Sequence, residues 1–349
     1  MSSDRKPKPS ELGYAMPAEW ARHAATWLSW PHNLETWPGC FDLVEPTMVE
    51  VVRTLVAEEL VHINVLDADH QAHVHALLDE LVPVERVRTH ICATNDAWIR
   101  DHGAIFVTHA DRHELAAIDF EYNAWGGKYP PFDRDREVAR FMAAALGVAR
   151  FEPGIVLEGG SIDVNGAGAL LTTEQCLLNS NRNPGFDRTA IEAELCSAFG
   201  VAQIIWLGEG IEGDDTDGHV DDLARFVAAD TVVTVVERNR DDPNFVRLQM
   251  NRDRLSKVRI ADRPLNVIEL PMPDPVFNQS QRLPASYANF YVANGLVLMP
   301  AFDCNQDKEA AHVLAACFPE RRVVAIDCRG LVAGLGALHC LTQQVPHVV

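Results

Sequence analysis

The chain lacks any run of about 18 apolar residues, the length that a helix needs to cross a membrane. Its first ten residues include Lys6 and Lys8 but no apolar segment, so they do not resemble a signal peptide. These absences predict a cytoplasmic protein with no membrane span. Because no linker rich in proline, glycine or serine follows, we expect residues 1–12 to form a disordered tail and residues 13–349 a single domain.

Positive charge is also scarce, with 30 Lys and Arg against 50 Asp and Glu and a formal net charge of -20. A nucleic-acid-binding protein needs a net positive face, so this balance argues against such a partner. Acidity can attract a small cationic ligand, although it also serves simply to keep a protein soluble. The charge therefore permits a small cationic partner without requiring one. We expect no nucleic-acid or membrane partner, and we leave a homodimer open.

Several short motifs are missing. The sequence has no G-x-S-x-G serine motif, no Walker loop and no convincing G-x-G-x-x-G loop. None of its eight cysteines forms a C-x-x-C pair, which argues against a zinc knuckle, and without a secretion signal we expect no disulfides. Four cysteines lie in apolar surroundings and are predicted to be inert core residues: Cys92, Cys176, Cys196 and Cys317.

Apolar periodicity predicts strands that alternate with helices. Strand patterns occupy residues 24–31, 61–66, 87–92, 104–107, 157–164 (broken by a glycine pair), 169–173, 203–207, 223–228, 231–236, 265–270 and 323–327, and a hairpin occupies 289–298. Helical patterns occupy residues 43–60, 68–81, 137–146, 188–199, 246–258 and 308–317.

Distinctive turns recur 50 to 71 residues apart, near Trp27, Trp98, Glu158, His219, Phe290 and Cys340. Such a period suggests about five repeated α/β modules, each presenting one turn. If the modules form a ring, the turns meet at its centre. The alternative is an ordinary α/β sheet whose loops happen to be evenly spaced.

Two of these turns suit a planar cation. In the first, the indole of Trp98 can stack on the cation while the carboxylate of Asp101 accepts two parallel N–H bonds. In the second, Glu158 precedes Gly159 and Gly160, which let a ligand or another backbone approach closely. The alternatives are a solvated turn beside a core tryptophan and a bulged strand end.

A third turn joins a proton carrier to a carboxylate. If Gly218 to Asp221 form a strand, His219 and Asp221 share one face. The pair also resembles part of a metal site, but no other histidine stands at a spacing that supplies a third ligand. We therefore predict acid–base chemistry and no metal.

Cys340 is the candidate nucleophile, and it requires a neighbour that lowers its pKa. In a strand, alternation would turn the adjacent His339 to the opposite face, so we predict the distant His219 as its partner. The alternative is a buried, inert thiol.

Eight segments carry a joint pattern that spans nearly the whole chain: residues 16–20, 98–101, 123–127, 157–161, 178–184, 218–221, 289–295 and 339–344. Together they resemble the agmatine deiminase family, also called the bacterial-type peptidylarginine deiminase family. The resemblance implies a pentein fold, an α/β propeller of five ββαβ modules around a central active site. It also implies hydrolysis of agmatine to N-carbamoylputrescine and ammonia through a covalent cysteine thiouronium, without any cofactor.

The same resemblance assigns roles by position. Cys340 matches the nucleophile, His219 the general acid and base, and Glu158 the acid that pairs with this histidine. Asp101 and Asp221 match the carboxylates that hold the guanidinium. The substrate wall is matched by Trp98, Gly160 and Trp125.

The chain departs from the family at a few positions that plausibly touch the far end of the substrate: Asn95, His102-Gly103-Ala104, Lys128 to Phe132 and Leu335-Gly336-Ala337. These departures leave other guanidines open, such as arginine or peptidyl-arginine, and also amidino transfer to an amine. Two further alternatives are a non-catalytic pentein binding protein and a metal amidohydrolase that uses His219 and Asp221.

Overall fold

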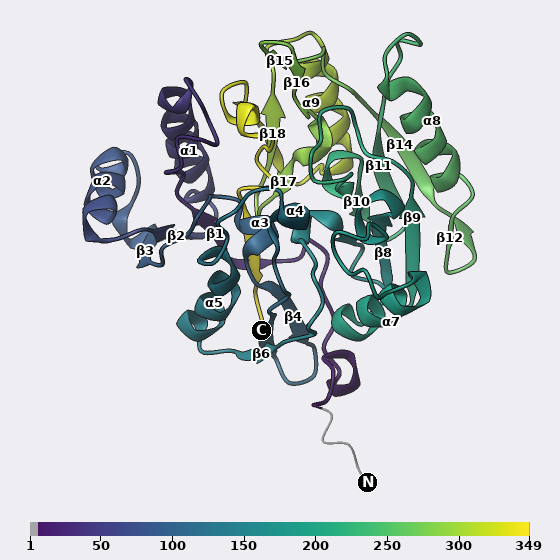
Figure 1. Ribbon diagram of the computed structural model, residues 1–349, viewed down its shortest axis with the longest axis horizontal. Helices are drawn as coiled ribbons and strands as arrows, with labels where there is room; N and C mark the ends of the chain where they lie inside the picture. Colours follow the sequence, from purple (N-terminus) through teal and green to yellow (C-terminus); the bar gives the residue numbers. More distant parts are fainter. Residues whose placement is uncertain (1–5, 349) are drawn as a thin grey trace.

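The computed structural model of the protein describes residues 6–348. Within this range, five β-sheets of three or four strands surround the centre of the molecule, and the longer helices lie on the outside (Figure 1). Two short helices, α3 (Ile99–His102) and α4 (Ala124–Gly127), lie near the centre instead. Two small two-stranded ribbons lie outside this arrangement: β12 (Arg259–Ile260) with β13 (Arg263–Pro264), and β15 (Phe277–Asn278) with β16 (Gln281–Arg282).

Four sheets repeat one arrangement, in which two antiparallel strands are followed by a helix and by a strand parallel to the second. The first module consists of β4 (Ile105–His109), β5 (Glu114–Ile118), α5 (Val138–Leu146) and β6 (Ala149–Phe151), and the second of β7 (Asp163–Val164), β8 (Ala169–Thr173), α7 (Arg188–Phe199) and β9 (Gln203–Leu207). The third module consists of β10 (Ala224–Ala228), β11 (Thr231–Val236), α8 (Asn244–Leu255) and β14 (Asn266–Pro271). The fourth module consists of β17 (Tyr291–Val292), β18 (Leu296–Ala301), α9 (Gln306–Cys317) and β19 (Arg322–Asp327).

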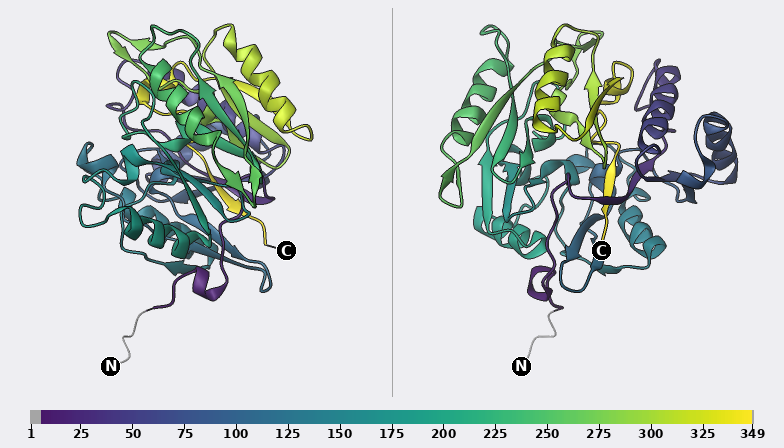
Figure 2. Two further views of the ribbon diagram at one scale, coloured as in Figure 1. Left: turned by 90° about the vertical axis from the view of Figure 1, so that its right-hand side faces the viewer. Right: turned by 180° about the vertical axis from the view of Figure 1, so that it is seen from behind.

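The fifth module is assembled from both ends of the chain. The last strand, β20 (Gln343–Pro346), pairs antiparallel with β1 (His23–Ser29), and Figure 2 shows the yellow C-terminal strand beside the purple N-terminal segment. Helix α1 (Phe41–Leu55) then leads to β2 (Leu60–Val65), which is parallel to β1. Helix α2 (Ala68–Leu78) and β3 (Val87–Ile91) extend this sheet. The prediction of five repeated modules is confirmed.

A short turn precedes the first strand of every module, and these turns form a closed circle. They are α3, η4 (Gly159–Ser161), η5 (Val220–Asp222), η6 (Tyr287–Asn289) and the turn of residues 338–341. Consecutive turns contact one another. The circle is closed by backbone hydrogen bonds from His339 N to Asn289 O and from Arg100 N to Cys340 O. Because the repeat places each turn equivalently, residues far apart in sequence meet at one point.

One strand prediction was wrong, and strand alternation does not describe two of the predicted turns. In residues 157–164, Gly159–Ser161 form a 3-10 turn and only Asp163–Val164 form a strand, and Val220–Asp222 form another 3-10 turn. Residues 339–341 form a turn ahead of β20. In each case a polar turn faces the centre of the ring, so the alternation expected of a strand does not apply.

The predicted disordered tail needs correction as well. Ser10–Leu12 form a 3-10 helix, and the ammonium of Lys8 lies 2.7 Å from the Glu194 carboxylate. Residues 1–5 of the predicted tail lie outside the described residues. No helix in residues 6–348 is long and apolar enough to span a membrane. All eight cysteines are free, as predicted.

Candidate active site

The Cys340 thiol lies at the wall of a cavity of about 770 Å³. Asn289 Nδ2 donates a hydrogen bond to Sγ over 3.2 Å, and Sγ lies 3.9 Å from Asp221 Oδ2. The thiol therefore stands beside one of the two carboxylates that the sequence assigned to the guanidinium.

The other carboxylate, Asp101 on α3, is held from two sides. Its Oδ1 accepts a hydrogen bond from Gly160 N and its Oδ2 accepts one from Trp125 Nε1, both over 2.9 Å. Trp125 reaches this position through a left-handed turn, with φ of 54° at Trp125 and 91° at Gly126, which the Asn123 side chain closes by accepting from Gly126 N. The turn at residues 123–127 therefore orients the indole N–H of Trp125 so that it donates to Asp101.

The missing side chain of Gly160 creates the space between these groups. A Cβ at this position would lie 2.6 Å from His219 Nδ1, 2.9 Å from Asp101 Oδ1 and 3.0 Å from Asp221 Oδ2. One imidazole and two carboxylates therefore pack against residue 160 more closely than any side chain would allow, which requires glycine there. A planar guanidinium carries N–H groups that suit such paired carboxylates.

His219 begins the η5 turn, where its backbone N–H lies 3.1 Å from Thr216 Oγ1 and from Asp214 Oδ2. Its ring is buried, and Nδ1 lies 3.8 Å from Asp101 Oδ1. Burial alone would lower the pKa of His219, but Asp101, the Cys176 thiol and Asp221 outweigh it and raise the pKa well above its usual value. In the free protein His219 is therefore protonated and able to act as an acid.

Glu158 lies behind this histidine. Its Oε1 accepts a hydrogen bond from Arg182 Nε over 2.7 Å, and its Oε2 is buried without a partner among residues 6–348. Donor atoms of Glu158, Cys176 and His219 lie within 4.8 Å of one another, a grouping that could hold a metal ion. The adjacent Arg182 guanidinium disfavours a cation there, and the predicted absence of a metal stays a prediction.

In the free protein, the surroundings of Cys340 disfavour the thiolate form of this residue. Burial, followed by the charges of Asp221, Asp222 and Asp101, raises the pKa of the thiol well above its usual value. Burial also raises the pKa of Asp101. The charge of Asp221 raises this pKa further, whereas the charge of His219 lowers it. A cation placed between the two carboxylates would relieve both effects, because it favours the charged form of each neighbouring acid.

The predicted pairing of Cys340 with His219 needs to be restated. Among the described residues, the thiol makes no hydrogen bond to either histidine; its partners are Asn289 and Asp221. His219 and the thiol are instead both close to Asp221. His339, which strand alternation was expected to turn away, lies inside the site and donates to Asp221, because residues 339–341 form a turn.

The predicted wall residue Trp98 lines the cavity together with Trp125, and a Cβ at Gly336 would meet the Trp98 ring at 2.5 Å. Asp96 and Asp135 line the same cavity. Burial raises the pKa of Asp96 to about 6 and that of Asp135 to about 7. The cavity wall thus carries a second pair of acids without a neutralising cation.

The positions that depart from the family pattern lie close to this wall. The Asn95 side chain accepts from the backbone N–H groups of Arg134 and Asp135, so it shapes the loop that bears Asp135. His102 is buried behind Asp101, and neither of its ring nitrogens has a partner among residues 6–348. Ala337 is buried three residues before the thiol.

Sequence reasoning missed five residues that contact the site: Glu19, Cys176, Arg182, Asn289 and His339. Four of them lie in the segments 16–20, 178–184, 289–295 and 339–344, which carry the family resemblance. The sequence therefore marked these segments but did not assign a role to the four residues. Cys176 was assigned to the core, which is correct for its burial but overlooks its position beside His219.

A five-module pentein ring with a cysteine, a histidine and paired carboxylates at its centre defines an enzyme class that modifies guanidino groups. The chain belongs to the Porphyromonas-type peptidyl-arginine deiminase family, whose sequence profile matches residues 15–346.

Related proteins and structures agree with this assignment. The chain is 38% identical to the agmatine deiminase of Ectopseudomonas mendocina, with 97% of each chain covered. It superposes on the agmatine deiminase of Enterococcus faecalis with a TM-score of 0.92 and 31% identity over 99% of each chain. It also superposes on a cysteine-to-serine variant of the C. jejuni enzyme with substrate bound, with a TM-score of 0.87 and 31% identity over 95% of this chain and 96% of that one.

Proposed function

We propose that the protein is a guanidine deiminase that converts agmatine and water to N-carbamoylputrescine and ammonia, with Cys340 as the nucleophile. The observation that carries the proposal is the convergence of Asp101, Asp221 and His219 beside Gly160, with the Cys340 thiol beside Asp221 and at the wall of the cavity. Relatives named as agmatine deiminases, 36–38% identical over nearly the full length, support the choice of substrate.

In the first half of the reaction, Asp101 and Asp221 accept N–H bonds from the guanidinium and hold its carbon against Sγ. The bound cation lowers the pKa of the thiol, which releases its proton to solvent in the cavity and attacks the guanidino carbon. His219 then donates a proton to the departing nitrogen. Ammonia leaves, and an S-alkylthiouronium remains on Cys340.

In the second half, the neutral His219 takes a proton from a water molecule that attacks the thiouronium carbon. As the C–S bond breaks, the hydroxyl group of the adduct gives its proton to the departing sulfur, so that Cys340 recovers its thiol and the ureido product leaves. Glu158 supports the charged form of His219 from behind the ring. One nucleophile and one acid–base group account for both halves of the reaction.

The acids on the cavity wall favour a guanidine that carries a second cation. Asp96 and Asp135 are buried, neither forms an ion pair within residues 6–348, and an ammonium group would stabilise their ionised forms. Arg134 lines the same cavity and could instead receive a carboxylate, which makes free arginine the second candidate.

The deciding experiment measures ammonia and ureido product from agmatine, arginine and a peptidyl-arginine. We expect turnover of agmatine, none after Cys340→Ser, and no loss after exhaustive chelation. A Cys340→Ser protein that still releases ammonia would disprove the mechanism, and loss of activity on chelation would favour a metal amidohydrolase. A product formed only when an amine acceptor is present would indicate amidino transfer.

Two further predictions belong to this proposal. A cytoplasmic location would be tested by fractionating cells that express the protein. The oligomeric state would be tested by light scattering of the purified chain, where a mass near twice 38.6 kDa would identify a homodimer.

A further inference from the structure

His339 forms a bridge between two buried carboxylates. Its Nδ1 lies 2.7 Å from Asp221 Oδ2, and its Nε2 lies 2.8 Å from Glu19 Oε2. Both nitrogens face acceptors, so satisfying both hydrogen bonds with ionised carboxylates requires a hydrogen on each. The arrangement that satisfies the three groups is an imidazolium between two carboxylates.

Glu19 is held firmly on the far side of the ring. Its Oε2 accepts from Arg225 Nη2 over 2.8 Å, and its Oε1 accepts from Val292 N over 2.9 Å. Burial would raise the pKa of Glu19, but Arg225 and His339, with Arg100, outweigh it and hold the pKa well below its usual value. Glu19 is therefore ionised at neutral pH. Through its contact with His339, it connects the segment of residues 16–20 to the site.

The backbone of His339 is fixed as well, because its N–H lies 3.0 Å from Asn289 Oδ1. With Asp221 Oδ2 bound to His339, Asp221 Oδ1 is left buried without a partner among the described residues. This free oxygen lies 4.0 Å from His219 Nδ1.

We propose that His339 is a positioning residue for the deiminase reaction: anchored by Glu19, it aims Asp221 and keeps it ionised to receive the guanidinium. The kinetic test of this inference depends on the proposed function, whereas the NMR test described below does not. His339 does not touch the reacting atoms and acts through Asp221.

The pH dependence of activity should reveal this role. Burial opposes ionisation of Asp221, but the hydrogen bond and charge of His339, followed by His219 and Arg225, lower its pKa. The other ionisable groups around Asp221 are Asp101, Asp222 and Cys340. An acid with a lowered pKa stays ionised to low pH, so removal of the His339 charge should move the acidic limb of kcat/KM to higher pH.

The variants His339→Asn and His339→Leu separate the hydrogen bond from the charge. Asn retains a neutral N–H donor toward Asp221, whereas Leu retains neither. We expect kcat/KM for agmatine to fall by about 10- to 100-fold in His339→Asn and further in His339→Leu, with the acidic limb raised in both. The matched control is His62→Asn, since His62 is also buried but contacts His90 on the β2–β3 sheet and should leave the limb unmoved.

If a His339 variant does not fold, Glu19→Gln removes the anchoring charge and should raise the acidic limb in the same direction. Full activity in His339→Leu, or a loss of activity with an unmoved limb, would overturn the proposal. ¹⁵N NMR of histidine-labelled protein tests it without substrate. Both ring nitrogens of His339 should carry hydrogen at neutral pH, and one bare nitrogen would disprove the bridge even if agmatine proves not to be the substrate.

Discussion

At the scale of single residues, the site depends on groups whose charge is balanced only when a cation is bound. Asp101 and Cys340 both have raised pKa values because they are buried among other acids. The same burial strengthens their interaction with a guanidinium, since the surrounding dielectric is low. The free protein is therefore complementary to a bound cation, which would favour the ionised forms of Asp101 and Cys340.

Replacing Asp101 with asparagine tests this complementarity. The side chain keeps its shape but loses the charge that holds the guanidinium, so we expect kcat/KM for agmatine to fall by about 10²-fold or more. Steady-state kinetics at neutral pH provide the measurement. A KM that merely doubles would show that Asp101 is not a guanidinium ligand.

Gly160→Ala tests the close packing of the site around this glycine. The added Cβ would lie 2.6 Å from His219 Nδ1 and would displace the imidazole and the neighbouring carboxylates, so activity should fall below about 1% of wild type. The matched control is Gly185→Ala, because a Cβ there meets nothing within 4 Å. Equal melting temperatures for both variants would locate the defect in binding, whereas an active Gly160→Ala enzyme would contradict the proposed position.

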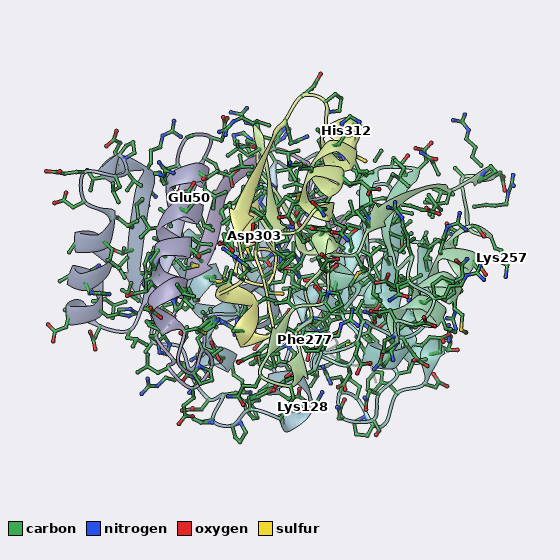
Figure 3. The ribbon with its side chains drawn as sticks, turned by 90° about the horizontal axis from the view of Figure 1, so that it is seen from above. Glu50, Lys128, Lys257, Phe277, Asp303 and His312 are labelled. Atoms are coloured by element: carbon green, nitrogen blue, oxygen red, sulfur yellow. The ribbon has the colours of Figure 1, made fainter. Side chains whose placement is uncertain are left out.

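At the scale of secondary-structure elements, catalysis relies on short turns rather than on strands. In four modules, a short helical turn ends just before the first strand; these turns are α3, η4, η5 and η6. Segments that line the cavity come from elsewhere, including the loop that contains Lys128 and the β15–β16 ribbon (Phe277–Asn278 and Gln281–Arg282). Figure 3 labels Lys128 and Phe277, which mark these two segments.

The loop that bears Asp135 should determine the preference for the substrate tail. The pKa of Asp135 is raised to about 7, so it becomes protonated below this pH and loses its attraction for an ammonium group. We expect the KM for agmatine to rise as pH falls from 8 to about 6 in the wild-type enzyme. In Asp135→Asn, KM should be higher by roughly tenfold and less dependent on pH over this range. An unchanged KM would remove Asp135 from the substrate site.

At the scale of the whole molecule, the ring closes only when its two ends meet. β20 completes the sheet that begins with β1, and Gln344 on β20 accepts a hydrogen bond from Arg100 Nη1. The nucleophile lies just before this closing strand. Closure of the ring and assembly of the site are therefore one structural event.

Truncation after Thr342 should test this coupling. Loss of β20 exposes the edge of β1 and the buried contacts of Val345, so we expect the free energy of unfolding in urea to fall by several kcal/mol. Truncation after Pro346 keeps β20 and should change stability little. Wild-type stability in the shorter chain would mean that the ring does not need its closing strand.

Prediction from the sequence succeeded where the signal was local or repeated. Helix Arg188–Phe199 and strand Gln203–Leu207 were predicted with their observed bounds, because apolar spacing and the Asp187 cap define them locally. The five modules followed from a period of 50 to 71 residues. Residues 157–164 were predicted as a strand, and strand alternation was used to orient side chains in the turns at 218–221 and 339–341. Both inferences failed, because buried polar turns satisfy long-range contacts that no short window contains.

The sequence by itself determined the repeat, most of the elements and the set of residues with chemical potential, from Asp101 to Cys340. Only the tertiary structure decided which of them meet. It placed His339, rather than His219, in a hydrogen bond with Asp221, and it brought Glu19 to a residue 320 positions away. The physical reason is that hydrogen bonds between turns depend on closure of the ring, whereas strand alternation describes only the neighbours of a residue along the chain.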